Sequence, residues 1–295
     1  MAFYRTLGLP ESCSTLASLI PLHRYIEHSD FTPLHLAVMG VLHVDLAKTL
    51  QNPAYAVGTD TKGLNELTPL HIATLRGDPH AAQIVVSAGA NLESPTSKGS
   101  VPLFPAARYR HPEVVRVLTR SGANPSATDF TGMQPIHGVA LADQESTPSV
   151  ISVLLQHGVD LDSRDEEGYT ALTFALGRGT VNTIRFLLER SADPNTVPLD
   201  GVLPLFVAVL TSGHVKVELL LQYGADTTVV EKERGYNVLH YVAHAGDVEM
   251  MGIFTGREFR RLLMGRFGDA MGRRRRIGWR RGSLAGRFGA RLLDW

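Results

Sequence analysis

The chain has 295 residues, of which 44% are hydrophobic and 20% charged, with 29 basic and 29 acidic side chains. This composition excludes intrinsically disordered and collagen-like chains. The longest clear apolar run, Leu205–Leu210, is far shorter than the ~20 residues of a membrane-spanning helix. The single cysteine, Cys13, excludes an internal disulfide and a thiolate metal site. We therefore expect a soluble intracellular protein, in the cytoplasm or the nucleus.

The zero net charge conceals two segments of opposite charge. Residues 257–295 hold twelve arginines, no lysine and three acids, a net charge of +9. The remaining 256 residues hold 17 basic and 26 acidic side chains, a net charge of −9. An asymmetry of this size indicates segments of different character, a mildly acidic body and a strongly basic tail.

The body consists of a repeated pattern. A Thr-Pro-Leu-His-like tetrapeptide precedes an alanine, a glycine, an apolar stretch and a Gly-Ala-Asp-like tripeptide, and its second position recurs every 33 to 36 residues. Fixed periods of 20–50 residues are typical of repeat architectures. The seven copies start near Thr32, Thr68, Val101, Gln134, Thr170, Leu203 and Asn237.

Each copy predicts two helices. Threonine is a favourable N-cap and proline suits the first helical position, so Thr68-Pro69 is expected to begin a helix. Leu70 and Ala73 lie three residues apart and therefore share one helical face. A second apolar stretch follows, and Gly89 supplies a left-handed C-cap. One such helix pair cannot bury its own apolar face, so neighbouring copies must stack into a solenoid.

The period and the Thr-Pro-Leu-His phrase resemble those of ankyrin-repeat proteins over residues 30–254. The resemblance implies an all-α ankyrin-repeat solenoid, in which stacked helix-turn-helix units are joined by β-hairpin-like loops. It also implies a non-enzymatic scaffold or adaptor that binds another protein. Residues 1–29 are then expected to be an N-terminal cap or a fragment of an upstream module. Residues 255–295 are expected to be an Arg/Gly-rich basic tail that is either disordered or a gene-model artefact.

Histidine is the residue type that most resembles a functional signal, with twelve copies in the chain. In ankyrin proteins the motif histidine forms hydrogen bonds within and between repeats, which implies a structural role for His35, His71, His137 and His240. His111 and His214 open second helices by the same register. Since no zinc-protease, phosphate-loop or nucleophile-elbow pattern occurs, the sequence predicts no catalytic residue, metal site or cofactor.

The resemblance also places candidate partner-binding residues. Partners of ankyrin proteins usually contact the hairpin tips and the end of the inner helix. Tyrosine and arginine are the residue types most enriched at the energetically dominant positions of interfaces. The positions selected by this register are Arg76, Arg108, Tyr109, Glu166, Glu167, Tyr169, Arg178, Tyr236 and His244.

The tail leaves several interpretations open. The run Arg273, Arg274, Arg275 and Arg276 resembles a nuclear-localisation or nucleic-acid patch. This supports an alternative function as a nuclear regulator whose tail contacts nucleic acid. The composition also changes abruptly within the last repeat, as a misread splice junction or shifted reading frame would produce, and membrane-surface binding is a third possibility. A further alternative function is the targeting arm of a larger multidomain protein. Otherwise we expect a monomer that binds a protein rather than nucleic acid.

Overall fold

The structure, a computed structural model, describes residues 31–40, 45–51, 58–141, 147–211, 213–230 and 235–254. The predicted cap at 1–29, Cys13, the tail at 255–295 and the patch Arg273–Arg276 lie outside these residues. The chain divides into two compact units, unit 1 (Met1–Glu166) and unit 2 (Glu167–Trp295). Each unit is described by itself below.

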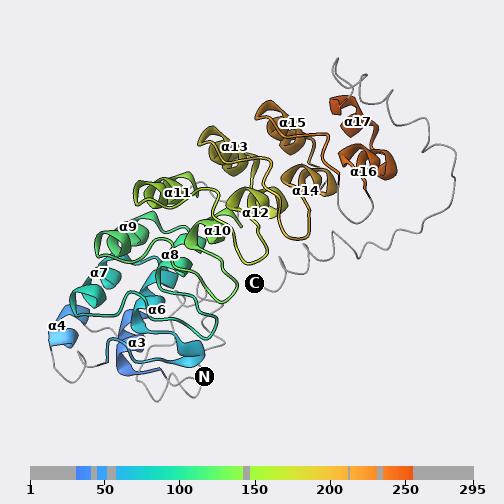
Figure 1. The fold of residues 1–295 in the computed structure, drawn as a ribbon. Coiled ribbons are helices and arrows are strands. Elements are labelled where there is room, and N and C mark those ends of the chain that lie inside the picture. The colour runs from blue at the N-terminus through green and yellow to red at the C-terminus, as the bar shows by residue number, and fades with distance from the viewer. Residues whose placement is uncertain are drawn as a thin grey trace, which may run out of the picture. The chain divides into compact units, whose positions relative to one another are not determined.

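Unit 1 is a series of helix pairs, one pair for each of the first four copies of the motif (Figure 1). A short 3-10 helix, η2 (Leu64–Glu66), lies in the loop before the second pair. The pairs are α3 (Pro33–Val38) with α4 (Leu46–Gln51), α6 (Pro69–Arg76) with α7 (Pro79–Ser87), α8 (Leu103–Arg108) with α9 (Pro112–Arg120), and α10 (Pro135–Ala140) with α11 (Thr147–Gln156).

Unit 2 continues the same pattern with the last three copies. Its loops include one isolated antiparallel β-bridge, between Val230 and Asn237. None of the described helices of either unit is long and apolar enough to cross a membrane. The pairs of unit 2 are α12 (Ala171–Arg178) with α13 (Val181–Glu189), α14 (Pro204–Leu210) with α15 (His214–Gln222), and α16 (Val238–Ala245) with α17 (Val248–Phe254).

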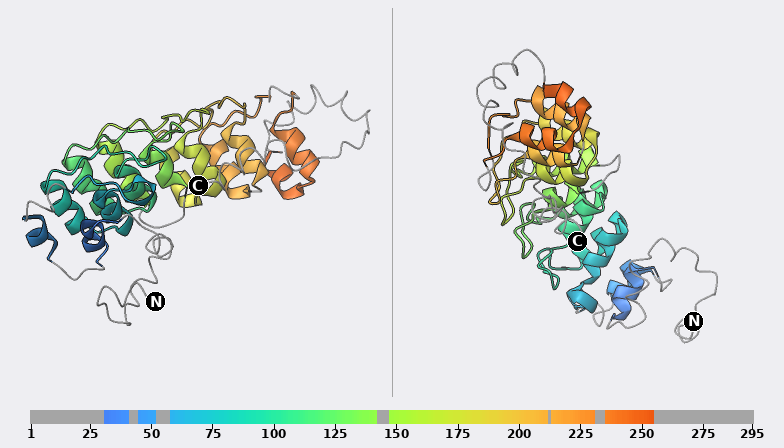
Figure 2. Two further views of the ribbon diagram at one scale, coloured as in Figure 1. Left: turned by 90° about the horizontal axis from the view of Figure 1, so that it is seen from below. Right: turned by 90° about the vertical axis from the view of Figure 1, so that its right-hand side faces the viewer.

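Within each unit the helices form two layers, shown from two further sides in Figure 2. The first helices of successive pairs pack against one another, α3 on α6, α6 on α8 and α8 on α10 in unit 1, and α12 on α14 and α14 on α16 in unit 2. The second helices do the same in their own layer. Side chains between the layers are fully buried, as Leu70, Ile72, Val115 and Leu118 illustrate. The predicted all-α ankyrin solenoid is confirmed.

The helix starts form as the sequence predicts. Thr68 is the N-cap of α6 and its Oγ1 accepts a hydrogen bond from the backbone N–H of His71, at 3.4 Å. The Nδ1 of His71 in turn accepts from the backbone N–H of Thr68, at 3.1 Å. This reciprocal capping satisfies two N–H groups that the first turn would otherwise leave without a partner. Thr32 with His35 and Asn237 with His240 cap their helices in the same way.

The motif histidine also joins neighbouring repeats. Because Nδ1 of His71 accepts a hydrogen bond, its Nε2 carries the proton and donates to the carbonyl oxygen of Ser100, 3.1 Å away in the next copy. His35 reaches Leu67 at 3.0 Å and His137 reaches Ser163 at 2.8 Å. Each bond ties a first helix to the loop that opens the following repeat.

Of the three copies without the histidine, two have phenylalanine at the same position and the fifth has Thr173. Phe104 replaces it in the third copy, and a Cβ on Gly138 of the fourth copy would lie 3.3 Å from the Phe104 ring. Glycine at 138 thus makes room for this ring. In the sixth copy the ring of Phe206 lies 5.4 Å, between centroids, from the ring of Tyr241, the residue after the motif histidine of the seventh copy. A ring contact therefore stands in for the hydrogen bond.

We expect His71→Ala to lower the free energy of unfolding by about 2–4 kcal/mol. The substitution leaves the Thr68 N–H without a partner, removes one of the two hydrogen bonds that the Ser100 carbonyl accepts, and creates a cavity, since His71 is fully buried. Urea denaturation followed by circular dichroism measures the change. His80→Ala is the matched control, because His80 is exposed on the neighbouring helix α7. Equal losses in the two variants would contradict the assigned role.

The motif histidines also predict a pH dependence of stability. Burial lowers the pKa of His71 and His137 from 6.5 to about 4, so the folded chain holds both neutral. The unfolded chain binds the extra protons first, and stability is lost as the pH falls from 6.5 towards 4, by roughly 3 kcal/mol for each histidine. The urea midpoint should therefore fall over this interval. His71→Gln should be less stable than the native chain near pH 7 but show a weaker dependence. An unchanged slope in this variant would refute the assignment.

Candidate functional site

Three predicted binding residues lie at the ends of consecutive first helices in unit 1. Arg76 is the last residue of α6, Arg108 the last of α8, and Tyr109 the C-cap of α8. Tyr109 is 45% exposed, and an exposed tyrosine offers both an apolar ring and a hydroxyl to a partner. Arg108 is half-buried, with one terminal nitrogen, Nη1, that is inaccessible and has no hydrogen-bond partner. The end of α8 therefore combines an exposed tyrosine with an arginine that has an unused hydrogen-bond donor.

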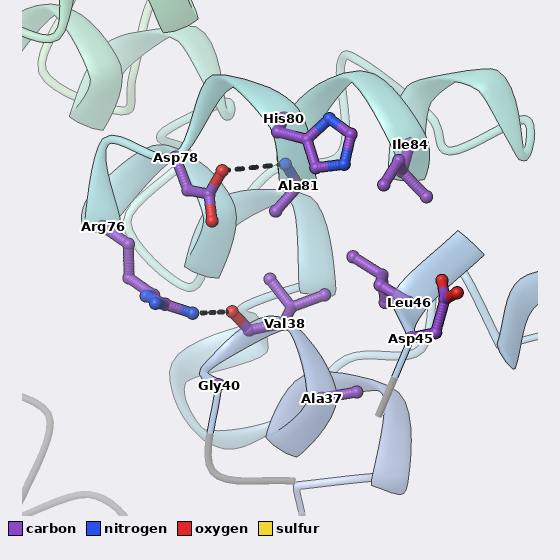
Figure 3. Close-up of a pocket in the computed structure, with 10 residues that line it drawn as sticks. All are labelled: Ala37, Val38, Gly40, Asp45, Leu46, Arg76, Asp78, His80, Ala81 and Ile84. Atoms are coloured by element: carbon purple, nitrogen blue, oxygen red, sulfur yellow. Dashed lines mark hydrogen bonds between the residues drawn. The ribbon is translucent and has the colours of Figure 1, made fainter. Parts of the chain in front are cut away.

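Arg76 has a structural role as well. Its guanidinium donates to the carbonyl oxygen of Val38 at the end of α3, which satisfies an acceptor that the helix end leaves open (Figure 3). Asp78, close by, accepts a hydrogen bond from the backbone N–H of Ala81 at 2.9 Å and caps α7. Part of the hydrogen-bonding capacity of Arg76 is thus committed to the fold.

These groups line a pocket of about 360 Å³ between the first two helix pairs (Figure 3). Its polar side chains include the Arg76 guanidinium and the Asp78 carboxylate, both of which bond to the backbone as described. The described residues contain no group of three or more His, Cys, Asp or Glu side chains placed to hold a metal ion. The lining residues are Ala37, Val38, Gly40, Asp45, Leu46, Arg76, Asp78, His80, Ala81 and Ile84.

The loop acids lie at hairpin tips. Glu166 is exposed, and its backbone N–H donates to the carbonyl oxygen of Thr131 in the preceding loop, at 3.2 Å. Glu167 is also exposed, and its carbonyl oxygen accepts from the N–H of Leu199 at 2.8 Å. Backbone hydrogen bonds between successive loops thus hold these side chains at the surface.

Tyr169 does not lie at the surface. It is only 2% exposed, its ring packs edge-on against Phe174 at 6.0 Å, and its hydroxyl donates to the carboxylate of Asp200. Tyr169 follows the loop glycine Gly168, and its apolar ring turns inward and packs in the core against the first helix of its repeat. Tyr169 positions Asp200 and is not itself available to a partner.

The other predicted residues of unit 2 have different surroundings. Arg178, the last residue of α12, is exposed. Tyr236 is half-buried and stacks on His240 with a centroid separation of 5.1 Å and an interplanar angle of 5°. The side chain of His244 lies outside the described set. The structure brings Arg76, Arg108 and Tyr109 onto one helix layer of unit 1. The predicted partner-binding residues of unit 2 are instead divided between loops and helix ends.

Sequence reasoning missed two exposed apolar side chains at the loop tips. Phe130 is 69% exposed and Leu199 is 75% exposed. Both stand two residues before the loop glycine, a position that holds Thr61, Ser97 and Glu166 in other copies. Comparison of the copies at this one position would have identified Phe130 and Leu199, because an apolar residue on a solvated tip contributes nothing to the core.

A polar contact between copies joins the second helices of unit 2. The Nε2 of His214, the first residue of α15, lies 3.0 Å from the carboxylate of Asp247. The hydrogen bond to Asp247 raises the pKa of His214, and Asp247 has its own pKa lowered, chiefly by the N–H of Met250 and then by His214. Both groups are partly exposed, so this pair holds two repeats together without forming a reactive site.

Comparison with known proteins agrees with this geometry. Two family models of ankyrin repeats match the chain, one described as three copies over residues 34–129 and one described as many copies over residues 142–188. The chain is an ankyrin-repeat protein. Its repeats form a protein-interaction repeat domain.

Individual relatives differ in what surrounds their repeats. The chain is 33% identical to the B-cell lymphoma 3 protein homolog of Mus musculus over 188 residues, 61% of this chain and 41% of the relative. It is 31% identical to the glycerophosphocholine phosphodiesterase gde1 of Schizosaccharomyces pombe over 173 residues, 58% of this chain and 15% of the relative. The chain thus spans less than half the length of these relatives. The solved ankyrin-repeat domain of Bcl-3 superposes with a TM-score of 0.65 at 23% identity, covering 78% of this chain and 100% of that domain, which shows the shared fold.

Proposed function

We propose that this chain is a non-enzymatic scaffold or adaptor that binds a partner protein through the ends of the first helices of unit 1. The observation that carries the proposal is Tyr109, a large side chain 45% exposed at the end of α8, next to the half-buried Arg108. A tyrosine beside an arginine is typical of the few residues that contribute most of an interface's energy.

The fold supports a mechanism of rigid presentation. The backbone around Tyr109 is fixed before a partner arrives, because the packed helices and the buried histidine bonds hold it in place. A preorganised surface loses little conformational entropy on binding, so a small number of contacts is sufficient. We propose that the chain acts as a monomer in the cytoplasm or the nucleus.

A second candidate function is that of a targeting arm within a larger protein. It is favoured by the coverage of the relatives, since the matched segment is 41% of one and 15% of the other. In the phosphodiesterase gde1 the matched residues are a small part of a chain named for its reaction. The binding surface proposed for unit 1 would then select the place where an attached module acts.

We expect Tyr109→Ala to weaken binding of the partner about fivefold or more, because the exposed ring is removed from the centre of the surface. The matched control is Tyr223→Ala. Tyr223 is also an exposed C-cap tyrosine, at 37%, but it follows the second helix α15. Full-length chain is immobilised, partners retained from an extract of the source cells are identified by mass spectrometry, and the affinity of each is measured with the purified variants.

Two results would contradict the proposal. Equal affinity for Tyr109→Ala and the native chain would show that the end of α8 is not the contact surface. Hydrolysis or group transfer catalysed by the purified native chain, and lost on heat unfolding, would show that the chain is an enzyme. Circular dichroism checks that both tyrosine variants keep the helical fold.

A further inference from the structure

The loops of unit 2 carry an unusual concentration of exposed apolar side chains. Leu199 is 75% exposed, Val197 on the same loop 43%, and Val230 on the next loop 46%. Only seven large hydrophobic residues are exposed among those that the structure describes, and these are three of them. We call Glu167, Val197, Leu199, Asp200 and Val230 the unit-2 loop surface. Apolar side chains that are exposed at loop tips do not contribute to the packing of the core. A cluster of them therefore indicates a binding surface.

The charge of this surface has one sign. Glu167 is exposed on the loop before α12. Asp200, next to Leu199, is held by the Tyr169 hydroxyl and by the N–H of Val202 at 3.0 Å, hydrogen bonds that stabilise a carboxylate. In unit 2 the described loop residues 167–170, 191–203, 223–230 and 235–237 contain no lysine or arginine. Arg190, directly after α13, stacks on Phe186, and residues 231–234 add two acids and two bases, which cancel. The complementary ligand is therefore both apolar and cationic.

A segment of that chemistry belongs to the same chain. Residues 257–295 carry a net charge of +9, and leucine, phenylalanine and tryptophan are placed among the arginines, for example at Leu262, Phe267 and Trp279. The segment begins three residues after Phe254, the end of α17 in unit 2. At ~3.3 Å per extended residue it is long enough to reach any loop of a unit of this size.

We propose that the arginine-rich segment 257–295 docks on the unit-2 loop surface of its own chain. Leucine and aromatic side chains of the segment cover Leu199 and Val197, and arginines pair with Glu167 and Asp200. Because the two partners are linked, the local concentration is on the order of millimolar, and contacts too weak for separate molecules are sufficient. The docked segment excludes other cationic ligands from these loops. This goes beyond the proposed function and does not depend on the Tyr109 surface.

The test is limited proteolysis of the full-length chain with trypsin, which cleaves after arginine. First cuts within 257–295 are timed by mass spectrometry for the native chain and for Leu199→Arg. This variant removes the apolar contact and adds a repelling charge, and its tail should be cut about tenfold faster. The matched control is Phe130→Arg, because Phe130 occupies the same position in its loop and is similarly exposed, but belongs to unit 1. It should be cut at the native rate.

Each other outcome overturns the proposal. Equal rates for all three chains mean that the segment does not dock, and faster cleavage in Phe130→Arg as well means that it has no preference for unit 2. Protection that arises only after RNA is added assigns the segment to nucleic acid. A transcript that continues the last repeat in place of residues 257–295 removes the occupant. Unfolding midpoints within error of the native chain show that both variants are folded. None of these results bears on the Tyr109 experiment.

Discussion

The hydrogen bond from the motif histidine to the next repeat is the interaction on which the rest of the architecture depends. One imidazole caps its own helix through Nδ1 and reaches the following loop through Nε2, as His71 does with Thr68 and Ser100. Both bonds require the neutral ring with its proton on Nε2. Burial enforces that state by lowering the pKa, and both ring nitrogens are occupied by hydrogen bonds, so the side chain that most resembles a catalytic group has a structural role.

The loops have a second, weaker set of connections. A side chain of one loop accepts a hydrogen bond from the backbone N–H of the residue 31 positions later. Asp60 accepts from Asn91, Glu93 from Asn124 and Asn195 from Asp226, each at 2.7 Å. The constant separation follows from the repeat period. These exposed bonds are individually modest, but they set the loops side by side at fixed spacing. A ligand therefore meets a row of tips whose backbone is fixed and whose side chains vary.

The repeat pattern was sufficient to predict the fold because each local signal points to the same structure. Thr68 and Pro69 start a helix, His71 needs both a cap and a neighbour, and Gly77 adopts a φ of +71° where a Cβ would meet the His111 ring at 2.3 Å. The binding surface was less predictable. Register gives the position of a side chain along the repeat but not its direction, so Tyr169 was expected at the surface although its ring fills the core.

The exposed residues that the register did not single out show where specificity lies. Positions such as those of Thr68 and His71 hold the repeats together, so a replacement there must supply another contact with the next repeat, as Phe104 and Phe206 do. The position two residues before the loop glycine has no such structural role, and it holds Ser97, Phe130 and Leu199 in different copies. Selection can alter these tips with little effect on stability. A chain built this way can therefore acquire a new partner by changing its loop tips and helix ends while the buried histidines preserve the stack.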